Sequence, residues 1–312
     1  MIEVNNLVKK YGNHVAVDDI SFMVEEGKIY GLLGPNGAGK STCMNIMTGY
    51  IAATSGEVKI NGHDIMKEAE EAKRYIGYLP EIPPLYPDMT VCEYLNFVAE
   101  LKKVPKGERS KEIEDVMSKT FILDMKNKLI KHLSKGYKQR VGLAQAMLGN
   151  PSVIILDEPM VGLDPKQILE IRELILSLKK EHTIILSSHI LSEVSAVCDE
   201  IMIISKGKMV ACDTPEGLSH MMQGDTTLEL DVKGNTNELS EILSAIEDIS
   251  SYITDEKENG IVHADIRIEN GKEIREVLFD MLAKGNMPIY RLETVSKSLE
   301  DIFLELTEEV EA

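Results

Sequence analysis

Short apolar runs separated by polar turns fill the first part of the chain. Residues 1–4, 21–24 and 56–60 predict short strands, and the last of these turns at Asn61-Gly62. Residues 29–33 form an apolar run that is typical of a buried strand.

The pattern becomes mostly helical between residues 87 and 145, with an interruption at Pro105-Lys106-Gly107. Apolar runs return at 153–156, 184–186 and 201–204, and each is followed by a turn or a helical segment. This alternation predicts an α/β fold with a mostly parallel sheet and flanking helices.

Residues 223–312 predict a separate small α+β domain. Leu228, Leu230 and Val232 alternate as a strand, a hairpin turns near residues 258–260, and residues 288–292 give a last strand. Apolar stripes mark three helices, at Leu239, Ile242, Leu243 and Ile246, at Ile274, Val277, Leu278, Met281 and Leu282, and at Leu299, Ile302, Phe303 and Leu306. The order β-α-β-β-α-β-α is ferredoxin-like with one added helix, and no motif in this part carries chemistry.

Length and charge support the same division. A chain of 312 residues is longer than one compact domain usually is, and its formal charge of −18 is unevenly distributed. Residues 223–312 contain 22 acidic and 8 basic residues, whereas the residues before them contain 30 and 26. We therefore expect one domain at 1–222 and an accessory domain at 223–312. The acidic balance also argues against a nucleic-acid partner.

One segment is basic instead. Residues 101–140 carry 12 Lys and Arg against 5 Asp and Glu. Two interpretations are open, a solvated helical face or a surface turned toward anionic lipid or an acidic partner loop.

The expected cellular compartment rests on the cysteine pattern and on the sequence signals that are not found. The four cysteines show no C-x-x-C spacing and predict reduced thiols. No segment resembles a signal peptide, and no apolar run reaches the roughly 18 residues of a membrane span. We expect a cytoplasmic chain that does not cross a membrane by itself.

Residues 34–42 fit the phosphate-binding pattern G-x-x-x-x-G-K-[ST], between the buried strand and a helix expected over 40–48. Glycines let the backbone wrap closely around phosphate. Lys40 should reach the β- and γ-phosphates, and the Ser41 hydroxyl should ligate Mg²⁺. We predict ATP and Mg²⁺ as ligands, with nucleotide contacts at Gly34, Pro35, Asn36, Gly37, Ala38, Gly39, Lys40, Ser41 and Thr42.

Two adjacent acids, Asp157 and Glu158, follow the apolar run at 153–156. At the end of a strand beside the phosphates, Asp157 can ligate magnesium, and Glu158 can direct a water at the γ-phosphate as general base. Without the phosphate loop upstream, two such acids would indicate no more than the end of a strand.

Five segments together resemble the ATPase subunits of ABC transporters, namely 34–42, 133–140, 153–159, 162–165 and 187–189. The resemblance covers residues 1 to about 222 and implies a P-loop NTPase core, an antiparallel β subdomain and a helical subdomain at about 87–145. It also implies that two copies pair head to tail. Ser134 and Gly136 of one copy would then face ATP held by the other, and Asp164 would contact the partner copy.

The resemblance implies three further roles. Tyr11 matches the aromatic residue that stacks on adenine, and His189 matches the histidine that contacts the γ-phosphate. Glu81 lies where most of the family has a glutamine that touches Mg²⁺ and senses the membrane subunit. The catalytic set is thus Glu158, His189 and Lys40, and the metal set is Ser41, Glu81 and Asp157.

The chain departs from the common family pattern at several positions. Glu81 adds negative charge near Glu158, Lys135 and Tyr137 replace a glycine and a glutamine, and Met160 stands where threonine is frequent. Together with residues 298–303 and the added C-terminal domain, these variants resemble the ABC-2 type branch. That branch includes drug-resistance, sodium-export and gliding-motility ATPases.

The leading hypothesis is an ATP-hydrolysing subunit that pairs with a second copy and drives a separate membrane permease, for export. It would be held at the cytoplasmic face of the membrane by that permease. One alternative is a non-transport ABC-type ATPase that acts on a macromolecular partner, although the chain has no second ATPase unit. Another is a regulatory subunit that binds ATP without hydrolysis, which intact Asp157, Glu158 and His189 oppose. For the C-terminal domain we expect dimer support or regulation.

Overall fold

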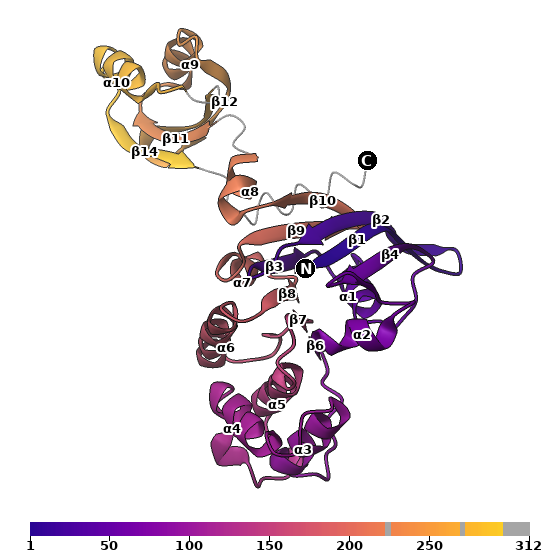
Figure 1. Cartoon of the computed structure of the whole chain (residues 1–312). Coiled ribbons are helices and arrows are strands. Elements are labelled where there is room, and N and C mark those ends of the chain that lie inside the picture. The colour runs from indigo at the N-terminus through magenta and orange to yellow at the C-terminus, as the bar shows by residue number, and fades with distance from the viewer. Residues whose placement is uncertain (222–225, 269–271, 296–312) are drawn as a thin grey trace. The chain divides into compact units, whose positions relative to one another are not determined.

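The computed structural model describes residues 1–221, 226–268 and 272–295. These residues fall into two compact units, Met1–Pro215 and a second unit that begins at Glu216 (Figure 1). Each unit has its own hydrophobic core. Within the described ranges, no helix is long and apolar enough to cross a membrane.

The first unit contains two sheets. The smaller is antiparallel, with the order β2-β1-β4-β5, and consists of β1 (Ile2–Tyr11), β2 (His14–Val24), β4 (Ser55–Ile60) and β5 (His63–Asp64). The larger has the order β10-β9-β3-β8-β7-β6 and consists of β3 (Ile29–Leu33), β6 (Ile76–Leu79), β7 (Val153–Leu156), β8 (Thr183–Ser188), β9 (Glu200–Ser205) and β10 (Lys208–Asp213). Its strands are parallel except β10, which runs antiparallel to β9. The expected α/β fold with a mostly parallel sheet is confirmed.

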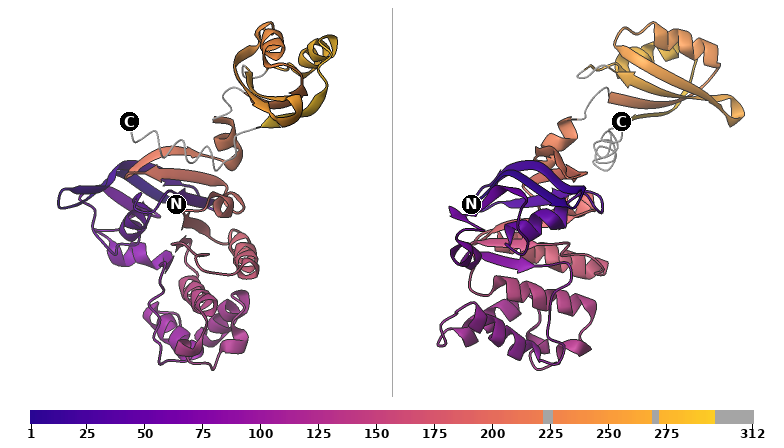
Figure 2. Two further views of the ribbon diagram at one scale, coloured as in Figure 1. Left: turned by 180° about the vertical axis from the view of Figure 1, so that it is seen from behind. Right: turned by 90° about the vertical axis from the view of Figure 1, so that its right-hand side faces the viewer.

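The core of the first unit lies where the two sheets and α1 (Lys40–Met47) meet. Ile2 and Ile20 come from the smaller sheet, Leu32 and Ile155 from the larger, and Met44 from the helix. Figure 2 shows the layers one above another, with the helices of residues 91–147 at the end opposite the antiparallel sheet. The phosphate-loop helix is therefore anchored on its buried side by both sheets.

The helical segment contains α3 (Val91–Leu101), α4 (Arg109–Lys119) and α5 (Lys135–Met147), with short 3₁₀ turns at Leu123–Met125 and Ile130–His132. A capping box starts α3: the Glu93 N–H donates to Thr90 Oγ1 at 3.2 Å, and the Thr90 N–H donates to Glu93 Oε2 at 2.8 Å. The predicted interruption at 105–107 lies between α3 and α4. The other helices of this unit and of its border are α2 (Ala69–Arg74), α6 (Pro165–Leu178), α7 (Leu191–Ser195) and α8 (Pro215–Met221).

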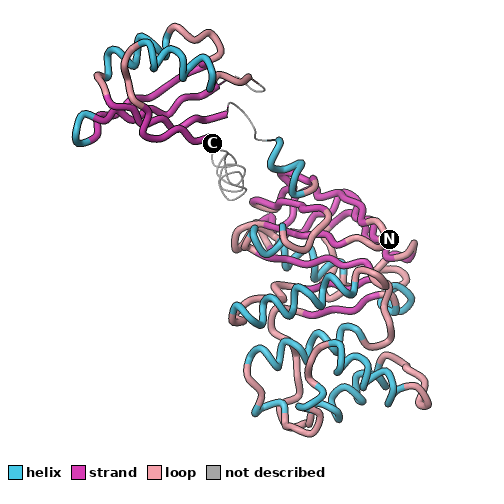
Figure 3. Tube along the Cα trace, turned by 90° about the vertical axis from the view of Figure 1, so that its left-hand side faces the viewer, coloured by secondary structure: helices cyan, strands magenta, loops and turns pink. Residues whose placement is uncertain are grey.

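The second unit is an antiparallel sheet of order β12-β13-β11-β14 with two helices. Its elements are β11 (Thr226–Lys233), α9 (Thr236–Ser244), β12 (Ile249–Lys257), β13 (Ile261–Ile268), α10 (Arg275–Lys284) and β14 (Ile289–Val295). Both helices lie over one face of the sheet (Figure 3). This strand order confirms the ferredoxin-like prediction, and the expected closing helix at residues 299–306 lies outside the described residues.

Two details of the sequence prediction were wrong. Strands β1 and β2 are longer than expected, because bulges between Val4 and Lys10 interrupt the period-two alternation on which the prediction relied. Asn6 and Asp19, both with left-handed backbone, are joined by a 2.9 Å hydrogen bond at this irregularity. In α10, Val277 was assigned to the buried stripe but is 51% exposed.

Candidate functional site

The phosphate loop connects β3 to α1 and depends on its glycines. Gly37 and Gly39 have φ values of 83° and 110°, in the region that side-chain-bearing residues rarely adopt. A Cβ atom at Gly39 would lie 2.5 Å from the carbonyl oxygen of Ala16, whereas one at Gly37 would meet nothing within 4 Å. The sequence thus folds this loop tightly against the strand β2.

The loop opens into a cavity of about 440 Å³. It is lined by Tyr11, His14, Ala16, residues 36–42, Glu81, Glu158, Val161 and His189. The structure therefore brings most of the predicted nucleotide and catalytic residues to one place. Three other predicted residues do not line the cavity but contact residues that do. Lys40 Nζ donates to the carbonyl oxygens of Gly34 and Pro35, and Ser41 Oγ donates to Asp157 Oδ1.

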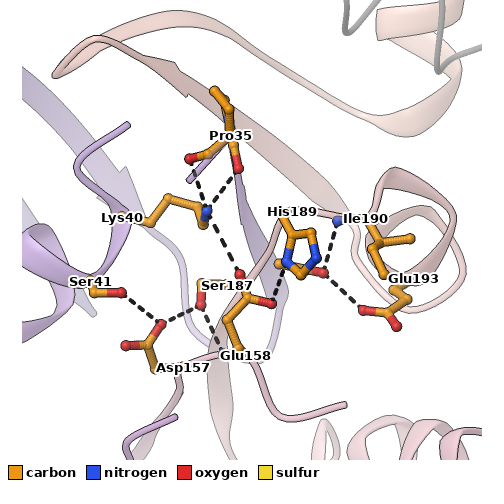
Figure 4. A network of polar contacts seen from close by, with 11 residues as sticks. Pro35, Lys40, Ser41, Asp157, Glu158, Ser187, His189, Ile190 and Glu193 are labelled. Atoms are coloured by element: carbon orange, nitrogen blue, oxygen red, sulfur yellow. Dashed lines mark hydrogen bonds and ion pairs between the residues drawn. The ribbon is translucent and has the colours of Figure 1, made fainter. Parts of the chain in front are cut away.

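Lys40 is held by loop carbonyls and by an acid (Figure 4). Its Nζ donates to Gly34 O at 2.7 Å and to Pro35 O at 3.3 Å, and it lies 3.7 Å from Glu158 Oε1. Burial lowers the pKa of Lys40, while the carboxylates of Glu158 and Asp157 act in the opposite direction. The Lys40 ammonium group thus lies at the wall of the cavity beside Glu158.

Asp157 and Glu158 leave the end of β7 in different directions. Asp157 Oδ1 accepts hydrogen bonds from Ser187 Oγ at 2.6 Å and from Ser41 Oγ at 3.3 Å. Glu158 instead reaches the cavity, where its Oε2 lies 3.0 Å from His189 Nδ1 (Figure 4). The side chain of Glu158 is only 9% exposed, so its carboxylate lies between Lys40 and His189 with little access to bulk water.

The backbone of Glu158 is strained. Its φ of 48° is left-handed, which is uncommon for a residue other than glycine. The Glu158 N–H leaves the strand ladder and donates to Ser187 Oγ at 2.9 Å. Backbone strain of this kind is often found at functional sites.

Tyr11 and Glu81 are exposed residues that line the cavity. Tyr11 is 50% exposed, and Lys9 Nζ lies 5.0 Å from the centre of its ring. The exposure of this ring argues against a role of Tyr11 in core packing. Glu81 is exposed and lines the same cavity.

Ser134, Gly136 and Asp164 do not line the cavity of their own chain. Ser134 caps α5, accepting the Tyr137 N–H at 3.4 Å, and Asp164 caps α6, accepting the Gln167 N–H at 2.9 Å. Gly136 lies against Gln167, because a Cβ there would be 2.5 Å from Gln167 Oε1. Ser134 and Asp164 are exposed and mark a second surface at the starts of two adjacent helices, whereas Gly136 is buried against Gln167.

The residues that would hold a divalent cation are oxygen donors. Ser41 Oγ and Asp157 Oδ1 are 3.3 Å apart, and Glu81 lines the adjoining cavity. Oxygen ligands of this type suit Mg²⁺, which usually binds one or two carboxylates and the phosphates of its substrate. In the described part of the chain, no group of three or more His, Cys, Asp or Glu side chains could hold a metal by itself.

Two residues of the site were not predicted from the sequence. Ser187 joins the two acids, and His14 lines the cavity. Ser187 belongs to the segment 187–189 used for the family resemblance, but the strand pattern does not tell which hydroxyl faces Asp157. Cys43, just after the loop, is fully buried, and burial raises the pKa of its thiol to about 12, so it is a packed residue.

Comparisons with known proteins agree with this geometry. The family described as ABC transporter matches residues 17–161. The linearmycin resistance ATP-binding protein LnrL of Bacillus subtilis (strain 168) is 32% identical over 308 residues, which cover 98% of each chain. The bacitracin transport ATP-binding protein BcrA of Bacillus licheniformis is 41% identical over 212 residues, 67% of this chain and 68% of BcrA.

A solved structure of similar fold is the dimeric post-hydrolysis state of the ATP-binding cassette MJ0796 bound to ADP and Pi. It is 25% identical, has a TM-score of 0.64, and the alignment covers 69% of this chain and 98% of that one. The similarity thus covers a whole cassette of that kind, whereas the alignment to LnrL extends over nearly the full length of both chains.

Proposed function

This chain belongs to the family of ABC transporter ATP-binding proteins and is an ATPase, and on that premise we propose that it drives export through a separate membrane permease. The names of LnrL and BcrA, which refer to linearmycin resistance and bacitracin transport, support the export direction. The permease would hold the chain at the cytoplasmic face of the membrane. In this proposal residues 1–222 are the ATPase domain and 223–312 an accessory domain.

The observation that carries the chemical part of the proposal is the position of Glu158. Its carboxylate is buried at the wall of the phosphate-loop cavity, 3.7 Å from Lys40 Nζ and 3.0 Å from His189 Nδ1. Lys40 would bind the β- and γ-phosphates, Glu158 would take the proton of the attacking water, and His189 would hold the base and contact the γ-phosphate.

Ser41, Asp157 and Glu81 would hold Mg²⁺ together with ATP. The Ser41 and Asp157 oxygens support this, because they already lie within hydrogen-bond distance of each other. When bound, Mg²⁺ neutralises the charge that develops on the phosphates. Glu81 brings a negative charge where a glutamine is usual in the family, so it would bind the cation more strongly than an amide does.

One chain supplies only part of the nucleotide site. We infer that Ser134 and Gly136 of a second copy add donors to the γ-phosphate and that Asp164 contacts the partner copy. The support is that Ser134 and Asp164 are exposed at the starts of α5 and α6 and, like the buried Gly136, do not line the cavity of their own chain. Closing of the pair on ATP and reopening after hydrolysis would move the permease through the segment at residues 81–88.

The experiment that tests this function replaces Glu158 by Gln in the full-length chain. We expect turnover to fall by about 100-fold or more while ATP affinity stays, because Gln keeps the size of the side chain but cannot accept the proton. Glu71→Gln is the control, since Glu71 is exposed and pairs with Arg74 on α2. Near-normal turnover of Glu158→Gln would remove Glu158 from the role of base.

A further inference from the structure

The side chain of Ser187 connects the two acids of the site. Ser187 lies near the end of β8, beside β7, and is fully buried. The preceding residue, Leu186, pairs with Leu156, the last residue of β7. The register of the parallel strands thus places the Ser187 hydroxyl next to Asp157 and Glu158.

Both hydrogen-bonding functions of this hydroxyl are used by the acids. Ser187 Oγ donates to Asp157 Oδ1 at 2.6 Å and accepts the Glu158 N–H at 2.9 Å. A serine hydroxyl has one proton to give, so the Asp157 bond fixes its direction. An alanine or valine would leave a buried backbone N–H without its partner.

The two contacts act on different parts of the site. The first holds the Asp157 oxygen that also accepts the Ser41 hydroxyl, and therefore the proposed cation ligand. The second holds the backbone of Glu158 in its left-handed conformation, with φ at 48°. A chain that relaxed from this conformation would turn the Glu158 carboxylate away from Lys40 and His189.

We propose that Ser187 is a positioning residue that aims the general base and the cation-binding carboxylate together. It does not line the cavity, and acts through its hydrogen bonds with Asp157 and Glu158 (Figure 4). This inference rests on the proposed role of Glu158 as general base.

The test compares three substitutions in the full-length chain. In Ser187→Ala we expect kcat to fall by about 10- to 100-fold, the range found when a partner of a metal-ligating group is removed. ATP affinity measured without Mg²⁺ should stay unchanged, because the loop and Lys40 are untouched, whereas the gain in affinity on adding Mg²⁺ should shrink. Ser187→Thr keeps the hydroxyl and should restore most of kcat.

Thr183→Val is the matched control. Thr183 lies at the other end of β8, is 1% exposed, and its Oγ1 likewise accepts a backbone N–H, from Gly27 at 3.0 Å. This variant loses a buried hydroxyl of the same strand without touching either acid. It should lower the unfolding temperature but leave kcat and the effect of Mg²⁺ as in the unchanged protein.

The outcomes separate this inference from the proposed function. Normal kcat and a normal Mg²⁺ effect in Ser187→Ala, together with an inactive Glu158→Gln, would overturn the role of Ser187 alone. An active Glu158→Gln variant would overturn the proposed role of Glu158 as general base. If Ser187→Ala does not fold, Ser187→Cys takes its place, because its thiol has a similar size but is a weak donor and acceptor. Full activity of that variant would contradict the assignment.

Discussion

Two glycines of the phosphate loop share a left-handed backbone but have different surroundings. Around Gly37 there is space for a methyl group, whereas at Gly39 the added carbon would lie 2.5 Å from Ala16 O. The conformational cost is similar at both positions, but only Gly39 carries a steric cost as well. Both positions thus require a left-handed backbone, whereas only Gly39 also requires the absence of a side chain for packing.

We expect Gly37→Ala to destabilise the protein by about 1–2 kcal/mol, the cost of a left-handed backbone for an L-residue. In a domain of this size that lowers the unfolding temperature by roughly 2–8 °C. Gly39→Ala should lower it clearly further, since the backbone of Ala16 must move. Thermal unfolding of the nucleotide-free proteins measures both effects, and equal unfolding temperatures would refute the packing requirement.

At the residue scale, the sequence predicts which side chains form the site better than it predicts how those side chains are oriented. Lys40, Asp157 and Glu158 were predicted from motif and strand pattern, and they lie together as expected. The role of Ser187 could not be predicted, because it depends on the parallel pairing of β7 with β8, which connects segments that are distant in the chain. The left-handed backbone of Glu158 has no sequence signal either, since a glutamate does not favour it.

At the scale of elements, Lys102 joins two helices. It follows the last residue of α3, and its Nζ donates to Ala146 O at 3.0 Å and to Leu148 O at 2.7 Å, at the end of α5. These bonds satisfy carbonyls that a helix end leaves free. Burial lowers the pKa of Lys102 to about 8.

This pKa predicts a pH effect on stability. Between about pH 8 and pH 10.5 the unfolded chain keeps the Lys102 proton while the folded chain has lost it, so raising the pH through this window favours folding. Below the folded pKa both states carry the proton, and the cost of burying the charge is fully present. We expect the unchanged protein to gain stability over Lys102→Met as the pH rises from 8 toward 10.

Thermal or urea unfolding across this pH range measures the difference. The exposed neighbour Lys103 provides the control, because Lys103→Met removes a charge that remains in water. A stability difference between the unchanged protein and Lys102→Met that does not vary above pH 8 would contradict the depressed pKa.

Elements were predictable where periodicity is regular. The order of strands and helices in the second unit follows from alternation and helical stripes, and it is found in the structure as predicted as far as β14. The irregular pairing of β1 with β2 was not predictable, because each bulge shifts the side chains that face the core by one position. The residues of the short strand β6 and of the outer strand β10 also show no clear hydrophobic alternation.

At the scale of the whole molecule, the chain combines two units that each have a core of their own. The candidate catalytic residues Lys40, Glu158 and His189 all lie in the first unit. The phosphate-loop cavity opens on one surface of that unit, and the starts of α5 and α6 lie on another. A head-to-tail pair of copies would let each chain complete the other's site.

The most direct test of this account is the molar mass of Glu158→Gln in solution, measured by light scattering with and without ATP and Mg²⁺. Because we expect this variant to bind ATP but to hydrolyse it at least about 100-fold more slowly, we predict a monomer without nucleotide and a dimer with it. Adding Ser134→Arg, which places a bulky side chain at the start of α5, should keep the protein monomeric while ATP still binds. A Glu158→Gln protein that stays monomeric at saturating ATP, or whose dimer is unaffected by Ser134→Arg, would contradict the shared site.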